Sequence, residues 1–68
     1  MNVKEAVTAA KQHLAALSAD LPVESLRLEE FFYDDHLCVW SLTIGGGGQS
    51  RIVRISEADK SVLSVTVR

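Results

Sequence analysis

The chain has 68 residues, of which 47 % are hydrophobic and 24 % charged, a composition typical of one small globular domain. Nine acidic against seven basic side chains give a net charge of −2, which argues against a protein dedicated to nucleic acids. The single cysteine, Cys38, excludes an internal disulfide, and no apolar run approaches the ~20 residues of a membrane span. The length predicts one domain over residues 1–68, and the short apolar runs predict no membrane partner. Because the amino terminus lacks the apolar segment of a secretion signal, we expect a cytoplasmic location.

The first predicted element is an amphipathic helix over Val3–Ser18. Asn2 followed by Glu5 forms a capping-box pattern at its start. Pro22 prevents the helix from continuing, because a proline ring disfavours helical backbone at the residue before it. The apolar residues recur at helical spacing and form one stripe that we expect to face the core: Val3, Ala6, Val7, Ala10, Leu14 and Leu17.

After the proline the apolar period becomes that of a strand, which predicts a first strand over Glu24–Tyr33. Its apolar side chains change parity midway, so one regular strand cannot bury them all on one side. A β-bulge near Glu29-Glu30 resolves this conflict. Asp34-Asp35-His36 then has the composition of a turn.

A second strand is predicted from the alternation of Cys38, Trp40, Leu42 and Ile44, which would share the inward face. Gly45–Gly48 would follow as a four-residue hairpin loop, because consecutive glycines do not stabilise a strand. Such a loop places Trp40 opposite Val53 and Cys38 opposite Ile55 of the third strand. Two interpretations of the glycine run stay open: a natural loop, or an engineered flexible replacement of a longer one.

The last strand, Val62–Arg68, follows a predicted turn at Ala58–Lys60, in which Lys60 takes the left-handed position. This turn sets Leu63 opposite Ile55 on the inward face. The predicted fold is therefore α+β: one N-terminal helix packed on a four-stranded antiparallel β-meander, in two layers. We expect Trp40 to be the largest side chain of its core.

His36 and Cys38 are two residues apart on the predicted strand and would point to the same side, close to Asp34 and Asp35. Such a group could begin a metal or nucleophilic site, but a zinc site needs three or four protein ligands and a catalytic cysteine needs a cleft. A turn histidine beside a small buried thiol is the preferred interpretation. We therefore predict no enzyme, catalytic residue, cofactor or metal ligand. A small metal-binding or catalytic protein around His36 and Cys38 stays the weaker alternative.

The sheet face away from the helix is the predicted partner surface, because apolar side chains gathered on adjacent strands can form a binding patch. Its residues are Leu37, Val39, Ile52, Arg54, Val62, Ser64 and Thr66. We expect a small interaction module that binds a protein or peptide through this face or through the last strand. The alternative is a structural homodimer that buries the same face.

Of the two strands at the sheet edges, the last is expected to accept an incoming strand, because it carries no charge before Arg68. The first strand would be protected by Arg27, Glu29, Glu30 and the bulge.

The stretch Val53–Val65, with an acidic turn before a Val-Leu-Ser strand, resembles the end of PepSY-like domains. The opening Val3–Leu17 helix and the Leu28-Glu29-Glu30 strand are similar to small bacterial proteins of that kind. The resemblance implies a helix-on-sheet domain that binds or inhibits a peptidase. No functional residue carries over, because the shared motifs are short and structural.

Overall fold

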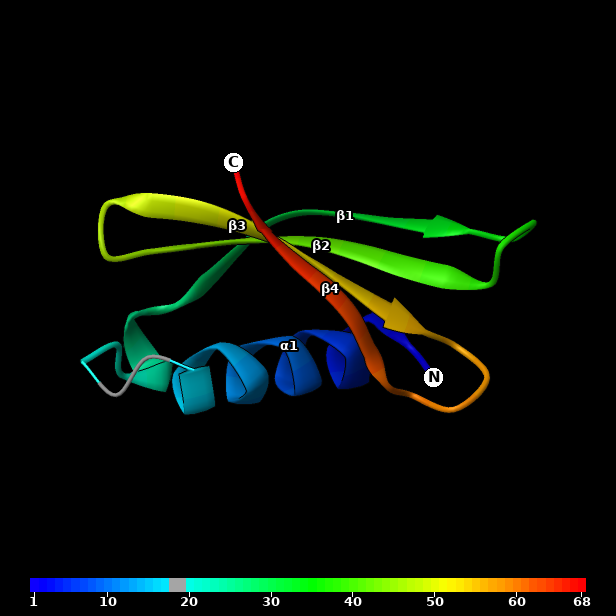
Figure 1. Ribbon diagram of the computed structural model, residues 1–68, viewed down its shortest axis with the longest axis horizontal. Helices are drawn as coiled ribbons and strands as arrows, with labels where there is room; N and C mark the ends of the chain where they lie inside the picture. Colours follow the sequence, from blue (N-terminus) through cyan, green and yellow to red (C-terminus); the bar gives the residue numbers. More distant parts are fainter. Residues whose placement is uncertain (18–19) are drawn as a thin grey trace.

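The computed structural model describes residues 1–17 and 20–68, which form one helix layer and one sheet layer (Figure 1). The elements are α1 (Val3–Leu17), a short 3-10 turn η1 (Val23–Ser25), β1 (Arg27–Asp34), β2 (Val39–Gly46), β3 (Gln49–Ser56) and β4 (Val62–Val67). The strands are antiparallel and lie in the order β1-β2-β3-β4. The predicted α+β, two-layer meander is therefore confirmed.

Helix α1 begins with the predicted capping box. The backbone N–H of Glu5 donates to Asn2 Oδ1 at 2.9 Å, and the N–H of Asn2 donates to Glu5 Oε1 at 3.1 Å. The predicted stripe is buried along its centre, at Ala6, Ala10 and Leu14, whereas Leu17 is exposed. The predicted end at Ser18 lies outside the described residues.

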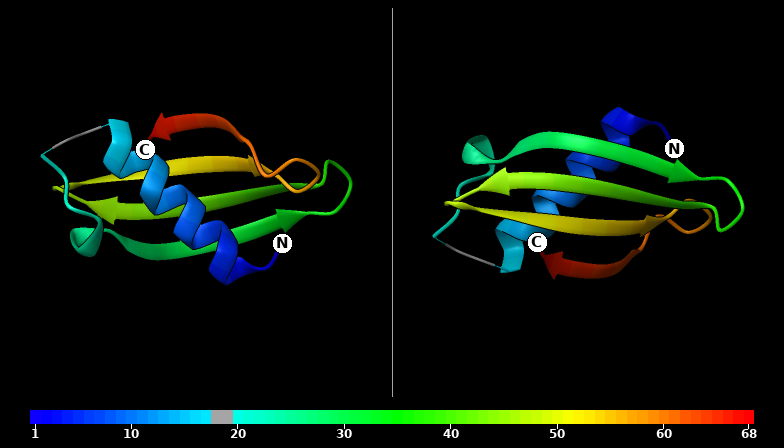
Figure 2. Two further views of the ribbon diagram at one scale, coloured as in Figure 1. Left: turned by 90° about the horizontal axis from the view of Figure 1, so that it is seen from below. Right: turned by 90° about the horizontal axis from the view of Figure 1, so that it is seen from above.

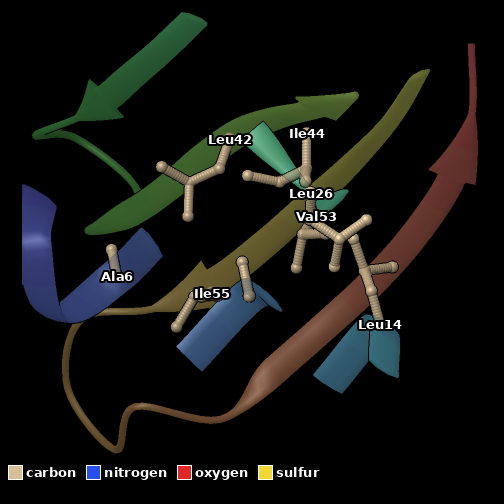
Figure 3. Close-up of a cluster of buried hydrophobic side chains, with 8 residues drawn as sticks. Ala6, Leu14, Leu26, Leu42, Ile44, Val53 and Ile55 are labelled. Atoms are coloured by element: carbon tan, nitrogen blue, oxygen red, sulfur yellow. The ribbon is translucent and has the colours of Figure 1, made fainter. Parts of the chain in front are cut away.

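The core lies where α1 crosses β2 and β3, and its side chains point toward one another (Figure 3). Its buried apolar members are Ala6, Ala10, Leu14, Leu26, Leu42, Ile44, Val53 and Ile55. Leu42 and Val53 are paired across the two central strands and have no exposed surface. The centre of the core is this aliphatic pair. Trp40, expected as the largest side chain of the core, is only partly buried and packs at its periphery.

β1 begins at Arg27, three residues later than predicted, because Val23–Ser25 form a single turn of 3-10 helix. The predicted bulge is confirmed. Pairing with β2 runs from Leu28 opposite Ile44 directly to Glu30 opposite Thr43, which leaves Glu29 as the extra residue.

The predicted four-residue loop at Gly45–Gly48 is wrong. The first two glycines belong to β2, and the hairpin closes on Gly47 and Gly48 alone, with φ of 62° and 79°. Positive φ at both positions is the requirement of a two-residue type I′ turn. Trp40 therefore pairs with Ile55 instead of Val53. Because the register moves by an even number of residues, each side chain keeps its predicted face.

The predicted strand position of Cys38 is also wrong, since Cys38 lies in the turn between β1 and β2 with φ of 55°. The register of β4 differs as well. Ile55 pairs with Val62 instead of Leu63, because Leu63 is the extra residue of a second bulge. Val62 therefore packs against the core, and Leu63 is 55 % exposed. Lys60 has φ of 59°, which confirms its predicted left-handed conformation.

Candidate interaction surface

The sheet face away from α1 holds most of the predicted partner surface. Arg54 and Ser64 are paired on this face, and Ile52 and Thr66 are paired beside them. Val39 begins β2 on the same side. Two predicted members lie elsewhere: Leu37 is exposed in the β1–β2 turn, and Val62 faces the core.

A polar contact spans this open face. Arg68, after β4, reaches Glu30 of β1, with Nη1 and Oε1 3.3 Å apart. Thr43 lies beneath this pair and is 4 % exposed, with its hydroxyl 3.5 Å from the same Glu30 oxygen. Such an exposed ion pair contributes little stability. The side chains of Arg68 and Glu30 nevertheless lie over Thr43 on this face. Less apolar surface is therefore exposed there than the pattern of apolar residues in the sequence indicates.

A second exposed surface lies on β1 and is called here the aromatic edge: Phe31, Phe32 and Tyr33, together with Trp40 of β2. Phe31 and Tyr33 pair with the inward-facing Leu42 and Trp40, so they lie on the helix side. Phe32 pairs with Ser41 and lies on the open face. The ring centroids of Tyr33 and Trp40 are 4.9 Å apart, and those of Phe31 and Trp40 are 6.5 Å apart.

The diagonal path of α1 explains why these rings are exposed. The helix crosses the sheet and leaves the end of β1 and the start of β2 uncovered (Figure 2). Phe31 is 54 % exposed and Phe32 62 % exposed. Large apolar side chains that are exposed together on one edge strand, instead of singly over the surface, are typical of a contact surface.

Glu57 accepts hydrogen bonds both from the amino terminus and from Trp40 of the aromatic edge. Its carboxylate accepts a hydrogen bond from the Met1 ammonium at 2.9 Å and another from Trp40 Nε1 at 2.6 Å. These two hydrogen bonds, the terminal one first, lower the pKa of Glu57 below the ordinary value of 4.5, although partial burial opposes the effect. The contacts fix the Trp40 ring in one orientation at the aromatic edge.

The lowered pKa predicts a stability difference in acid. A carboxyl group whose pKa is lower in the folded chain stabilises the fold fully above its unfolded pKa, and this contribution is lost as pH falls through the folded pKa. The melting temperature of the parent should therefore fall more between neutral pH and acid pH than that of Glu57→Gln. Thermal melts at both pH values measure this difference, and equal losses in the two proteins would contradict it.

The side chains of the weaker metal or catalytic alternative are not brought together. His36 is exposed in the turn, and its Nε2 lies 4.0 Å from Asp35 Oδ1. The Cys38 thiol is exposed and contacts the carbonyl oxygen of Asp35 at 3.8 Å. Asp34 accepts backbone N–H groups of the turn through Oδ1. Within residues 1–17 and 20–68, no group of three His, Cys, Asp or Glu side chains is arranged to hold a metal ion.

Comparisons with known proteins add no family: no family model, no curated protein and no solved structure matches the chain. The resemblance to PepSY-like domains therefore has no support from them. In the described part of the chain, no helix has the length and apolar character needed to cross a membrane.

Sequence reasoning missed the aromatic edge, although one signal pointed to it. Three consecutive aromatic residues, Phe31-Phe32-Tyr33, cannot all face one side of a strand, so at least one ring must lie away from the core. The predicted bulge near Glu29-Glu30 accounts only for the change of parity before Phe31 and would place Phe31 and Tyr33 on the inward face. It shifts the parity, but α1 does not extend over that end of the sheet.

Proposed function

We propose that the protein is a non-enzymatic interaction module of the cytoplasm that binds a protein or peptide partner through its sheet. The observation that carries the proposal is the aromatic edge, which exposes large apolar side chains on an edge strand. Aromatic residues are enriched at protein interfaces, where their rings supply most of the binding energy. The open face around Ile52 and Arg54 is the adjoining part of the same sheet.

Selection from a random peptide library displayed on phage tests this proposal. The immobilised parent protein should enrich peptides that do not bind Leu42→Asp, a variant expected to be unfolded because it buries an unpaired charge at a fully buried core position. Binding that depends on the folded domain supports the proposed function. If no sequence is enriched over the unfolded variant, the proposal is wrong.

A homodimer in which β4 pairs with β4 of a second copy is the second candidate, favoured because this edge strand carries no charged side chain before Arg68. Residues 24–35, around β1, hold five acidic side chains and one basic, so pairing of β1 with its own copy would bring like charges together. Sedimentation at several concentrations should then give twice the mass of the chain. Ser64→Lys and Thr66→Lys, which are exposed on the outer side of β4, should weaken this association with little change in melting temperature. A concentration-independent monomer would exclude the dimer.

A further inference from the structure

The two edges of the sheet are not equally suited to an added strand. An antiparallel edge strand leaves alternate N–H and C=O groups free of partners within the sheet, and both β1 and β4 are edge strands. The pairing of β1 with β2 is regular from Glu30 to Asp34. Each edge strand has one bulge, at Glu29 in β1 and at Leu63 in β4, and β4 pairs regularly with β3 from Ser64 to Val67. The regular segments of β1 and β4 are thus similar in length, and what distinguishes the two edges is the side chains that an added strand would contact.

The side chains of β1 would contact an added strand on both of its faces. Phe31 and Tyr33 lie on the helix side, with Trp40 behind them, and Phe32 lies on the open side. Successive residues of a strand point to opposite faces, so alternate side chains of a partner would reach these rings from both sides. β4 carries no aromatic residue.

The negative charge around β1 favours a partner with basic side chains. Five acidic residues and one basic residue lie within residues 24–35. Burial foremost, together with the Cys38 thiol and the carboxylates of Glu57 and Asp35, raises the pKa of Tyr33. The surroundings of this ring therefore disfavour a further negative charge. Aromatic ring faces attract cations, and arginine or lysine over such a ring is a common contact.

We infer that the partner is an extended segment containing lysine or arginine, which adds to β1 as a further strand of the sheet. This inference rests on the proposed function, since it names the partner and the edge of that same interaction surface. The backbone of β1 supplies the hydrogen bonds, the aromatic edge supplies the apolar contact, and the acidic side chains favour the basic residues.

Two synthetic peptides serve as probes: one alternates valine with lysine, and the other alternates valine with glutamate. The single tryptophan, Trp40, lies at the aromatic edge and reports binding by its fluorescence. We expect the lysine peptide to change this emission and to shift the backbone amide signals of β1 in NMR spectra. Binding should weaken as salt concentration rises, because exposed charges are screened. The glutamate peptide should leave the spectra unchanged.

Two matched variants locate the binding edge. Phe31 is 54 % exposed on β1 and Leu63 is 55 % exposed on β4, so replacing either by threonine removes a similarly exposed apolar side chain. Phe31→Thr should weaken binding of the lysine peptide about tenfold, because the ring contact with the cation is lost. Leu63→Thr should bind like the parent. Melting curves verify that both variants are folded.

Amide shifts confined to β4, equal binding of the two peptides, or a loss of affinity only in Leu63→Thr would each overturn the inference. So would self-association of the parent through β1, since the occupant would then be a second copy. Failure of both peptides also overturns it. The phage selection, whose library is unbiased in composition, decides the proposed function separately from these results.

Discussion

Leu42→Ala is expected to lose most of the free energy of unfolding of the parent protein. Leu42 has no exposed surface and lies between Phe31 and Val53 on the neighbouring strands. Truncation of such a leucine removes its burial and leaves a cavity, at a cost of about 2–5 kcal/mol. A domain of 68 residues lies near the low end of the usual stability range of about 5–15 kcal/mol. Urea denaturation followed by circular dichroism measures the change in the free energy of unfolding.

Phe32→Ala is the matched control, because it truncates a larger side chain that is 62 % exposed. Its free energy of unfolding should stay within about 0.5 kcal/mol of the parent. A Leu42→Ala protein with a near-parental unfolding curve would mean that the core is not centred on Leu42 and Val53.

The secondary structure and the faces of the strands were predictable because both depend on local patterns. The helical stripe and the Asn2–Glu5 cap identify α1, and period-2 alternation identifies the inward faces of β2 and β3. These inward faces are predicted correctly although the register at the glycine hairpin is not, because a shift by two residues keeps every side chain on the same face. Alternation gives the wrong faces at the start of β4, because a bulge there places Val62 inward and Leu63 outward.

The partial burial of Trp40 could not be predicted from the alternation of apolar residues, because this burial depends on where α1 crosses the sheet. Trp40 is inward-facing, as predicted, but the helix covers Leu42 and Val53 and leaves the end of β1 open. The exposure of the aromatic edge depends on the same crossing.

Of the predicted partner surface, only Leu37 and Val62 lie elsewhere, because of the β1–β2 turn and the bulge of β4. An exposed patch depends on which parts of a face are covered, and the Arg68–Glu30 contact across the open face joins residues distant in sequence.

The four glycines occupy positions that disfavour a side chain, the first two because a neighbour lies close and the last two because of their backbone conformation. A Cβ on Gly45 would lie 2.6 Å from Glu29 Oε2, and a Cβ on Gly46 would lie 2.7 Å from Leu26 Cδ2 and 3.3 Å from the Ser25 carbonyl oxygen. Gly47 and Gly48 have positive φ, which side chains disfavour. A physical constraint therefore favours glycine at each of the four positions. A flexible replacement loop would not require such constraints.

Gly46→Val and Gly47→Val should each lower the free energy of unfolding by about 1–3 kcal/mol, the first by overpacking against Leu26 and the second by backbone strain. Gly47→Asn is the control for the second, because asparagine tolerates the left-handed conformation far better than a β-branched residue does. Its cost should be well below that of Gly47→Val. Urea denaturation of the three variants measures these differences. If all three unfold like the parent, the hairpin does not depend on a specific turn at Gly47-Gly48, and the interpretation of the glycine run as a flexible replacement loop is favoured.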